Sequence, residues 1–287
     1  MLRPALVMTF VLSLALAPAL ARAVSPASGT PPDESHEAIA MRCFGLQSSD
    51  PAAAIVLAES TLSRGGVPVE PEIKLLVCLA RASALAGEAE RVDAAVARID
   101  RLLAHNTLPP EFLLRALSNA GAALHTVGRI HEALDFYVRA FEVAAGDESS
   151  IAQVTTLINV AEIHGAELGA YEEAEAYFAR AEAIERDAGL GDPLLAYNRG
   201  INFLRLGRET DALAAFTDAE PKANKPTHAM VLRRIRAELI ALRGSGADFA
   251  DTRAALQAAA AEQLAQDDPA GAALTLIRLS DLERKKG

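Results

Sequence analysis

A motif that recurs three times within residues 110–220 is the strongest constraint on the fold of this chain. Each copy has a small residue in a helical stretch and a Gly seven or eight residues later. An Ala follows five residues after that Gly, then an aromatic residue four later and a second Ala three later. The copies are Gly121, Gly128, Ala133, Tyr137 and Ala140; Ala161, Gly169, Ala174, Phe178 and Ala181; and Gly200, Gly207, Ala212, Phe216 and Ala219. A unit that repeats in this way buries its apolar face against its neighbours, so we expect a stack of similar units.

The hydrophobic pattern predicts helices throughout. Apolar residues recur at three- and four-residue spacing, and no run alternates β-branched residues as a strand would. The expected helices are 34–47, 51–64, 71–86, 89–105, 110–127, 130–144, 149–168, 171–187, 193–206, 209–220, 226–243, 248–266 and 270–285. The chain is rich in Ala and has no Trp, which also favours helices because Ala has the highest helix propensity. We therefore expect an all-α protein.

Start and stop signals divide these helices into pairs. A proline opens the first helix of several pairs, where its missing N–H costs least, at Pro71, Pro110, Pro193, Pro226 and Pro269. Asp192 and Asp268 precede two of these prolines as N-caps. A glycine marks the turn within four pairs, at Gly87, Gly128, Gly169 and Gly207. The result is about six pairs and a final helix.

The repeated motif resembles the tetratricopeptide repeat family. The family places a small residue where two helices cross, a Gly at the turn, and Ala, an aromatic residue and Ala along the second helix. Ala133, Ala174 and Ala212 are 41 and 38 residues apart, which indicates a variant with a longer period than the usual one of about 34. The resemblance implies an α-solenoid of antiparallel pairs, a right-handed superhelix with a concave groove and a capping last helix. It spans 34–287 and is strongest over 110–220.

The first 23 residues have the features of a secretory signal. Arg3 precedes an uncharged apolar run over 5–20, and Ala21-Arg22-Ala23 fits a small-x-small cleavage site. We expect cleavage after Ala23, then a linker over 24–33 and no remaining membrane span. The alternative is an uncleaved anchor, since a run of about 16 apolar residues is marginal for spanning a bilayer. The Ala- and Arg-rich composition indicates a bacterial source, and hence the periplasm.

Catalytic, metal and cofactor signatures are absent from the sequence. It contains no GxxxxGK[ST], HExxH, GxSxG or CxxC motif, and its six His are scattered. The formal net charge of -10 disfavours nucleic acid as a partner, because no large positive field is available. We therefore expect no enzyme activity, no cofactor and no metal, although an unrecognised active site stays an alternative.

The two cysteines, Cys43 and Cys78, are predicted in the first helices of adjacent pairs. In an oxidising compartment they could form a disulfide. Cys is also among the most often buried residues, so two separate core thiols are an alternative. Neighbouring helices lie about 9 Å apart, whereas a disulfide needs Cα atoms within about 7 Å. On that geometry we expect unpaired thiols.

The resemblance also indicates a binding surface, because first helices line the groove in this family. Alignment of the units on their turn glycines places Asn119, Asn159 and Asn198 at one position, where family members often contact a peptide backbone. The same alignment places five cations on that side, interrupted by Glu162 and Glu238: Lys74, Arg81, Arg115, Arg205 and Arg234. Such a lining suits an acidic or C-terminal peptide. Alternatively, the charges are simply solvated and the Asn side chains bond within their own repeat.

The sequence therefore favours a non-enzymatic adaptor that holds a peptide or protein segment in the groove of a periplasmic repeat array. The alternative is the sensory ectodomain of a membrane signalling protein, such as a diguanylate cyclase or a sensor kinase. Residues 274–287 look like the first helix of a further pair, which is the feature behind this alternative.

Overall fold

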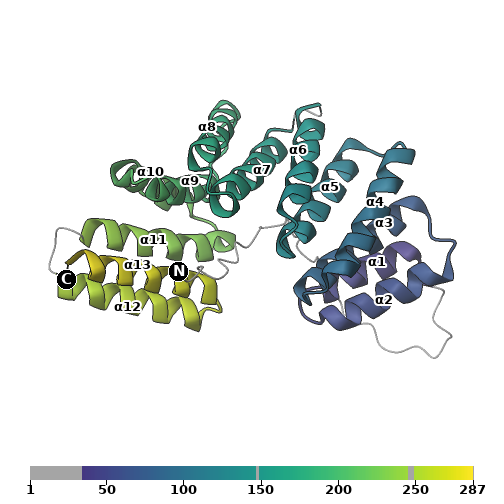
Figure 1. Ribbon diagram of the computed structural model, residues 1–287, viewed down its shortest axis with the longest axis horizontal. Helices are drawn as coiled ribbons and strands as arrows, with labels where there is room; N and C mark the ends of the chain where they lie inside the picture. The colour runs from purple at the N-terminus through teal and green to yellow at the C-terminus, as the bar shows by residue number, and fades with distance from the viewer. Residues whose placement is uncertain (1–33, 147–148, 245–248, 287) are drawn as a thin grey trace. The chain divides into compact units, whose positions relative to one another are not determined.

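A computed structural model of the protein describes residues 34–146, 149–244 and 249–286 (Figure 1). They form two compact units, the N-terminal unit (34–146) and the C-terminal unit (149–286). Thirteen α-helices, a π-helix and a 3₁₀ turn account for the regular structure of the described residues, without strands. The expected signal peptide and linker lie outside this part of the chain.

The N-terminal unit consists of three antiparallel helix pairs (Figure 1). The first helices pack in sequence, so that the middle one contacts both of its equivalents. The pairs are α1 (His36–Leu46) with α2 (Pro51–Arg64), α3 (Val69–Leu85) with α4 (Ala89–His105), and α5 (Pro110–Thr126) with α6 (Ile130–Gly146).

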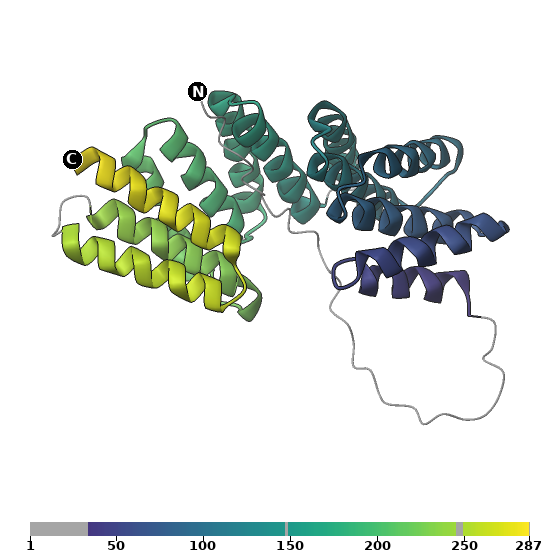
Figure 2. The same cartoon turned by 60° about the horizontal axis from the view of Figure 1, so that its bottom comes forward.

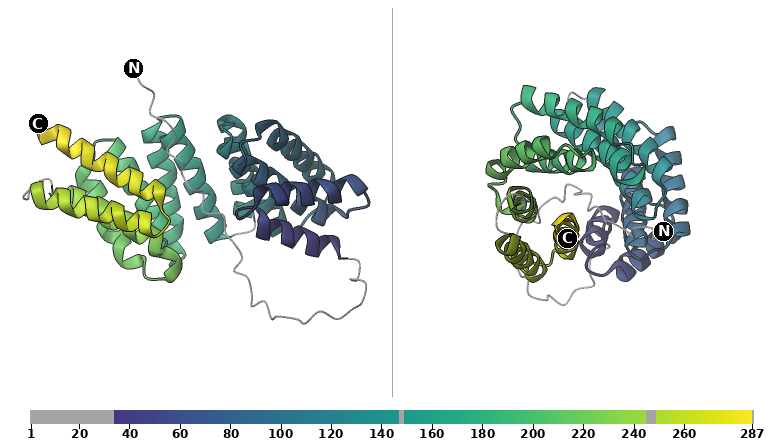
Figure 3. Two further views of the ribbon diagram at one scale, coloured as in Figure 1. Left: turned by 90° about the horizontal axis from the view of Figure 1, so that it is seen from below. Right: turned by 60° about the vertical axis from the view of Figure 1, so that its left-hand side comes forward.

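The C-terminal unit continues the same plan with three pairs and a further helix (Figure 2). Its elements are α7 (Ser150–Glu162) with the π-helix η1 (Ile163–Glu167), α8 (Tyr171–Asp187), α9 (Pro193–Arg205), α10 (Glu209–Lys222), the 3₁₀ turn η2 (Pro226–His228), α11 (Ala229–Arg243), α12 (Phe249–Ala265) and α13 (Pro269–Lys286). First helices again pack in sequence, α7 on α9, α9 on α11 and α11 on α13. Helices α11, α12 and α13 all contact one another, and Figure 3 shows the chain from two further directions. The predicted all-α solenoid of helix pairs is confirmed.

Helix boundaries follow the predicted proline signals with two exceptions, one of which is Pro226: it opens the 3₁₀ turn η2, and α11 begins only at Ala229. Helix α3 begins at Val69, two residues before Pro71, so Pro71 lies in the first turn and does not open the helix. Its missing N–H is still harmless, because the first four N–H groups of a helix have no partner within it. The four turn glycines adopt left-handed φ angles of +67° to +79°. This conformation has a low energetic cost for Gly, because Gly has no Cβ.

The small residues of the repeat lie where helices cross. A Cβ at Gly200 would lie 2.6 Å from the ring of Phe216, and one at Gly121 would lie 3.0 Å from the ring of Tyr137. Both rings are fully buried. The crossing therefore brings the first helix directly onto the aromatic residue of the second.

The extra residue before Gly169 is accommodated by the π-helix. In the neighbouring units seven residues separate the crossing residue from the turn glycine, whereas eight separate Ala161 from Gly169. The wider turn Ile163–Glu167 absorbs the additional residue. As a result, Gly169 still takes its left-handed turn conformation, with a φ of +67°.

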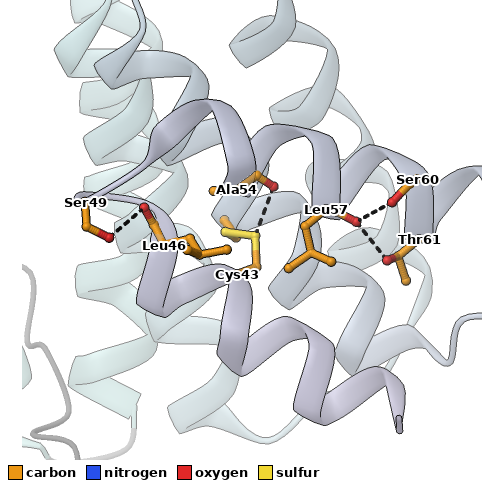
Figure 4. Close-up of a disulfide and its surroundings, with 8 residues drawn as sticks. Cys43, Leu46, Ser49, Ala54, Leu57, Ser60 and Thr61 are labelled. Carbon is orange, nitrogen blue, oxygen red and sulfur yellow. Dashed lines mark hydrogen bonds between the residues drawn. A yellow bond between two sulfur atoms is a disulfide. The ribbon is translucent and has the colours of Figure 1, made fainter. Parts of the chain in front are cut away.

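The expectation of unpaired cysteines is wrong, because Cys43 and Cys78 form a disulfide between α1 and α3 (Figure 4). Their Cα atoms are 6.1 Å apart, and both residues are fully buried. The expectation compared the separation of helix axes with a limit that applies to Cα atoms. Each Cα lies about 2.3 Å from its own axis, so two Cα atoms that face each other approach more closely than the axes do.

Candidate functional site

In the N-terminal unit, two of the predicted groove cations are paired with acids. The Lys74 Nζ lies 2.6 Å from Glu37 Oε1 of α1, and it also lies 5.8 Å from the centroid of the Phe112 ring. Arg115 Nη1 lies 2.9 Å from Glu111 Oε1, one turn earlier in the same helix. These exposed pairs contribute little to stability, and a ligand that used either cation would compete with the acid beside it.

The other two predicted residues of this unit, Asn119 and Arg81, differ in their surroundings. Asn119 Nδ2 donates a hydrogen bond of 2.8 Å to the Arg115 carbonyl oxygen, which is the local bonding expected as the alternative to ligand contact. Arg81 is half-buried, and desolvation lowers its pKa.

In the C-terminal unit, three predicted residues surround a half-buried carboxyl group. Asn198 Nδ2 of α9 donates a hydrogen bond of 2.6 Å to Glu162 Oε1 at the end of α7. Arg205 of α9 and Arg234 of α11 are the two cations that act electrostatically on this carboxyl. We call Glu162, Asn198, Arg205 and Arg234 the α7–α9–α11 cluster.

The environment of Glu162 favours its protonated form. Burial raises the pKa of its carboxyl, the charges of Arg205 and Arg234 lower it, and Glu167 raises it again. The net effect is a pKa of about 7. At neutral pH the carboxyl is therefore present in both protonation states, which is unusual for Glu.

Arg234 is held by an acid that the sequence analysis considered only as a helix cap. Its Nη2 and Nε donate to the two carboxylate oxygens of Asp268 at 2.6 and 3.0 Å. Asp268 also accepts a hydrogen bond of 2.9 Å from the Gly271 N–H at the start of α13. Burial raises the pKa of Asp268, but these hydrogen bonds outweigh burial and the pKa lies below its ordinary value. Arg234 is consequently a structural cation with a fixed orientation.

A second buried ion pair joins the same two helices. Glu238 of α11 accepts a hydrogen bond of 3.0 Å from Arg278 Nε of α13, and its side chain is 6% exposed. Burial raises the pKa of Glu238, against the opposing effect of Arg278. Like Asp268, Arg278 was not among the predicted residues.

Arg205 is the cation of the cluster with a free guanidinium. It is exposed, and its guanidinium carbon lies 6.0 Å from the centroid of the Tyr171 ring. Within residues 149–244 and 249–286, no ion pair of 4.0 Å or less involves Arg205. This side chain can therefore accept an anionic partner without breaking an existing pair.

The remaining predicted residue, Asn159, is buried within the repeat. Its exposed fraction is 8%, so its amide is not part of an open surface. Asn202 of α9, which was not predicted, is 1% exposed. Its Nδ2 donates a hydrogen bond of 2.9 Å to the Tyr171 carbonyl oxygen. Its Oδ1 has no hydrogen-bond partner among the described residues, and it faces Gly165 of η1. An unpaired buried oxygen thus lies against the π-helix that follows Glu162.

Neither a metal-binding group nor a membrane-spanning helix is found among the described residues. No group of three or more His, Cys, Asp or Glu side chains in it is arranged to hold a metal ion. Within the same residues, no helix has both the length and the apolar character that crossing a bilayer requires.

Comparison with known proteins supports the repeat assignment. The tetratricopeptide repeat family model matches residues 112–187. No curated protein sequence matches the chain. Several solved structures share the fold at low sequence identity.

One similar structure is a signal transduction ATPase with a tetratricopeptide repeat sensor from Pyrococcus horikoshii, with a TM-score of 0.68 and 13% identity, covering 87% of this chain and 39% of the other. This chain thus spans about two fifths of that protein. Aspartyl phosphate phosphatase F from Bacillus subtilis gives a TM-score of 0.60 and 13% identity. That match covers 86% of this chain and 70% of the other. A Rap protein complexed with competence and sporulation factor gives a TM-score of 0.55 and 18% identity. That match covers 87% of this chain and 75% of the other.

Proposed function

Because the chain is a tetratricopeptide repeat protein, we propose that it is a non-enzymatic interaction scaffold that holds an extended peptide or protein segment along its first helices. The observation that carries the proposal is the α7–α9–α11 cluster. It combines an amide, a titrating carboxyl and a free guanidinium on consecutive first helices of one unit. A similar fold occurs in a Rap protein complexed with competence and sporulation factor, which supports binding of a partner by this architecture.

The cluster suits the backbone and one carboxylate of such a segment. The Asn198 amide offers both a donor and an acceptor, which matches a peptide backbone without requiring a particular side chain. Arg205 can make charge-assisted hydrogen bonds to an acidic side chain or a C-terminal carboxylate. The ligand class we propose is an extended segment with at least one carboxylate at this point.

We further propose that the chain is exported to the periplasm. The signal-like residues 1–23 support export. The Cys43–Cys78 disulfide independently supports an oxidising compartment, because disulfides are rare where thiols are kept reduced. N-terminal sequencing of the mature protein should begin at Val24, and a mature chain that keeps Met1 would refute cleavage.

A second candidate function is that of a sensory ectodomain. The similarity to a signalling ATPase with a repeat sensor supports this alternative, in which the ligand of the array would control a linked output. Both candidates require the same first-helix surface, and they differ in whether binding changes the activity of another domain.

The experiment is capture of a partner followed by titration. The chain from Val24 onward is used to isolate partners from periplasmic extract, and the bound segment is mapped and synthesised. Calorimetry then compares the wild type with Asn198→Ala and Arg205→Gln. Removing the Asn198 amide should weaken binding by about 0.5–1.5 kcal/mol, the net value of one hydrogen bond.

The matched control is Arg186→Gln, because Arg186 is an exposed cation near the end of the second helix α8. It should bind as tightly as the wild type. If Asn198→Ala and Arg205→Gln also bind as the wild type does, the first-helix scaffold is wrong for this unit and the partner docks elsewhere.

A further inference from the structure

Helix α13 has one side that is open to solvent although its residues are apolar or small. Leu276 and Ile277 are 48% and 52% exposed. Ala273, one turn before them, and Ser280, one turn after them, are exposed as well. Residues spaced by three and four positions lie on one face of a helix. We call Ala273, Leu276, Ile277 and Ser280 the open face of α13.

The other sides of α13 pack on the two preceding helices. Thr275 Oγ1 donates a buried hydrogen bond of 2.8 Å to Gln263 Oε1 of α12. Arg278 Nε donates a hydrogen bond of 3.0 Å to Glu238 Oε2 of α11. Leu279 belongs to an apolar cluster with residues of both helices. The open face is therefore not the side by which α13 joins the array.

Helix α5 shows how the equivalent face is used in the N-terminal unit. Both α5 and α13 begin at a proline, and their starts are 159 residues apart. The same shift relates Leu276 to Leu117 and Ser280 to Gly121. Leu117 is 2% exposed, and Gly121 is also buried. A face that is covered in α5 is thus uncovered in α13.

The second helix of the pair, α6, is what covers Gly121. A Cβ at Gly121 would lie 3.0 Å from the Tyr137 ring and 3.3 Å from the Ala133 carbonyl oxygen, and both residues belong to α6. Ala133, Tyr137 and Ala140 are all fully buried. A helix with the pattern Ala-x3-aromatic-x2-Ala therefore fits this face, because its ring fills the crossing and its small residues let the backbones approach closely.

Helix α13 has no such cover among the residues that the structure describes. Single exposed apolar residues are common on protein surfaces and need no partner. The open face differs from that case, because its four residues are consecutive along one helix face and occupy positions that the repeat buries in α5. Ser280 is also small, as is the residue at this position in the three strongest repeats.

Going beyond the proposed function, we propose that the open face of α13 binds an amphipathic helix of a partner protein in the place of a second helix. The partner helix has the pattern small-x3-aromatic-x2-small. Its aromatic ring lies against Ser280, and its apolar side buries Leu276 and Ile277. Binding of an amphipathic helix through residues at three- and four-residue spacing is an established mode of recognition.

The first test uses a helix of this chain as the probe. A synthetic peptide with the α6 sequence Ile130–Gly146 carries a fluorophore, and its anisotropy is measured as the chain from Val24 onward is added. We expect saturable binding. Ile277→Asp should weaken it about tenfold or more, because a charge replaces an apolar side chain that becomes buried. The peptide change Tyr137→Ser should weaken it similarly.

The matched control is Ile151→Asp in α7. Ile151 is an isoleucine of the same unit with 58% exposure, and it lies outside the open face. The Ile151→Asp variant should bind the peptide as the wild type does. If it weakens binding as much as Ile277→Asp does, the open face is not the binding site.

A joined version of the probe removes the limit set by peptide affinity. The segment Arg129–Gly146 is attached after Gly287, so that its Tyr follows Ser280 by 16 residues, as Tyr137 follows Gly121. Linking raises the effective concentration of the helix. The joined chain should melt a few degrees higher than the wild type, and Ile277→Asp should abolish this gain. If the free peptide does not bind and the joined helix gives no gain, the proposal is overturned.

Two further outcomes identify other binding modes. The chain alone should sediment as a monomer; a dimer that Ile277→Asp dissociates would show that a second copy covers the open face, and would overturn the partner helix. Asn198→Ala should leave peptide binding unchanged. If Asn198→Ala abolishes binding and Ile277→Asp does not, the peptide uses the α7–α9–α11 cluster, so the open face is wrong while the proposed function stands.

Discussion

Replacing Gly200 with Ala tests the helix crossing on which each repeat depends. The new methyl carbon would lie 2.6, 2.8 and 3.0 Å from three ring carbons of Phe216, which is fully buried. Real contacts of this type are longer than about 3.4 Å, so ring or helix must move by several tenths of an ångström in a tightly packed core. Such overpacking costs about 1–3 kcal/mol.

The substitution also has a favourable part. Gly in the middle of a helix is about 1 kcal/mol less favourable than Ala, so Gly200→Ala gains that amount before the clash is counted. The expected net effect is a destabilisation of about 0–2 kcal/mol, or up to a few degrees in Tm. The control is Gly45→Ala in α1, where a Cβ meets nothing within 4 Å. That variant should be neutral or slightly stabilising.

A double-mutant cycle identifies the ring as the cause. Phe216→Leu removes the ring atoms nearest to the new methyl group, so Gly200→Ala should cost much less in that background than in the wild type. Urea unfolding followed by circular dichroism gives the four free energies of unfolding. If Gly200→Ala stabilises the protein as Gly45→Ala does, or if its cost is the same with Leu at 216, the crossing is not where we place it.

Three further predictions concern stability. Cys43→Ala with Cys78→Ala should destabilise the N-terminal unit by about 2–4 kcal/mol in the absence of reductant, and equal denaturation midpoints with and without reductant would contradict the disulfide. Glu162 has a raised pKa in the folded protein, so its contribution is most favourable below its unfolded pKa and is lost as the pH rises through about 7. Glu162→Gln should therefore gain stability over the wild type between pH 5 and 8, by about 3 kcal/mol in total, and a gain that does not change with pH would refute the shift. Tyr137→Ala and Phe178→Ala should each cost about 3–5 kcal/mol, measured by urea denaturation, because these side chains are 0% and 2% exposed.

The parts of the fold that depend on local spacing could be predicted from the sequence. Gly200 and Phe216 are 16 residues apart, and Gly121 and Tyr137 have the same separation. That repeated distance, with a turn glycine between, is sufficient to place a helix crossing. The extra residue before Gly169 was visible too, but only the structure shows that a π-helix absorbs it.

The pairing of charges could not be predicted in the same way. An ion pair in this fold joins a cation of a first helix to an acid about one repeat away in the sequence. The structure pairs Lys74 with Glu37 and Arg234 with Asp268, at sequence separations of 37 and 34 residues. Opposite charges separated by about one repeat length are therefore a sequence signal for such pairs.

The three predicted amides lie in different surroundings, which the sequence could not show for another reason. Alignment on the turn glycines treats equivalent positions as equally exposed, yet Asn159 is buried and Asn119 bonds its own helix, and only Asn198 joins a cluster. Exposure depends on the neighbouring repeats, which the alignment does not contain.

The disulfide affects how the array comes apart. In a stacked array each pair is stabilised by its neighbours, and among the described residues of the N-terminal unit the pair α1–α2 packs on α3 alone. Its helices have 11 and 14 residues, against 17 in α3, so this pair can bury less surface against its neighbour. In such arrays unravelling begins at the pair with the fewest neighbours. The bond from Cys43 to Cys78 prevents α1 from separating from α3, so fraying at this end requires the first two pairs to loosen together.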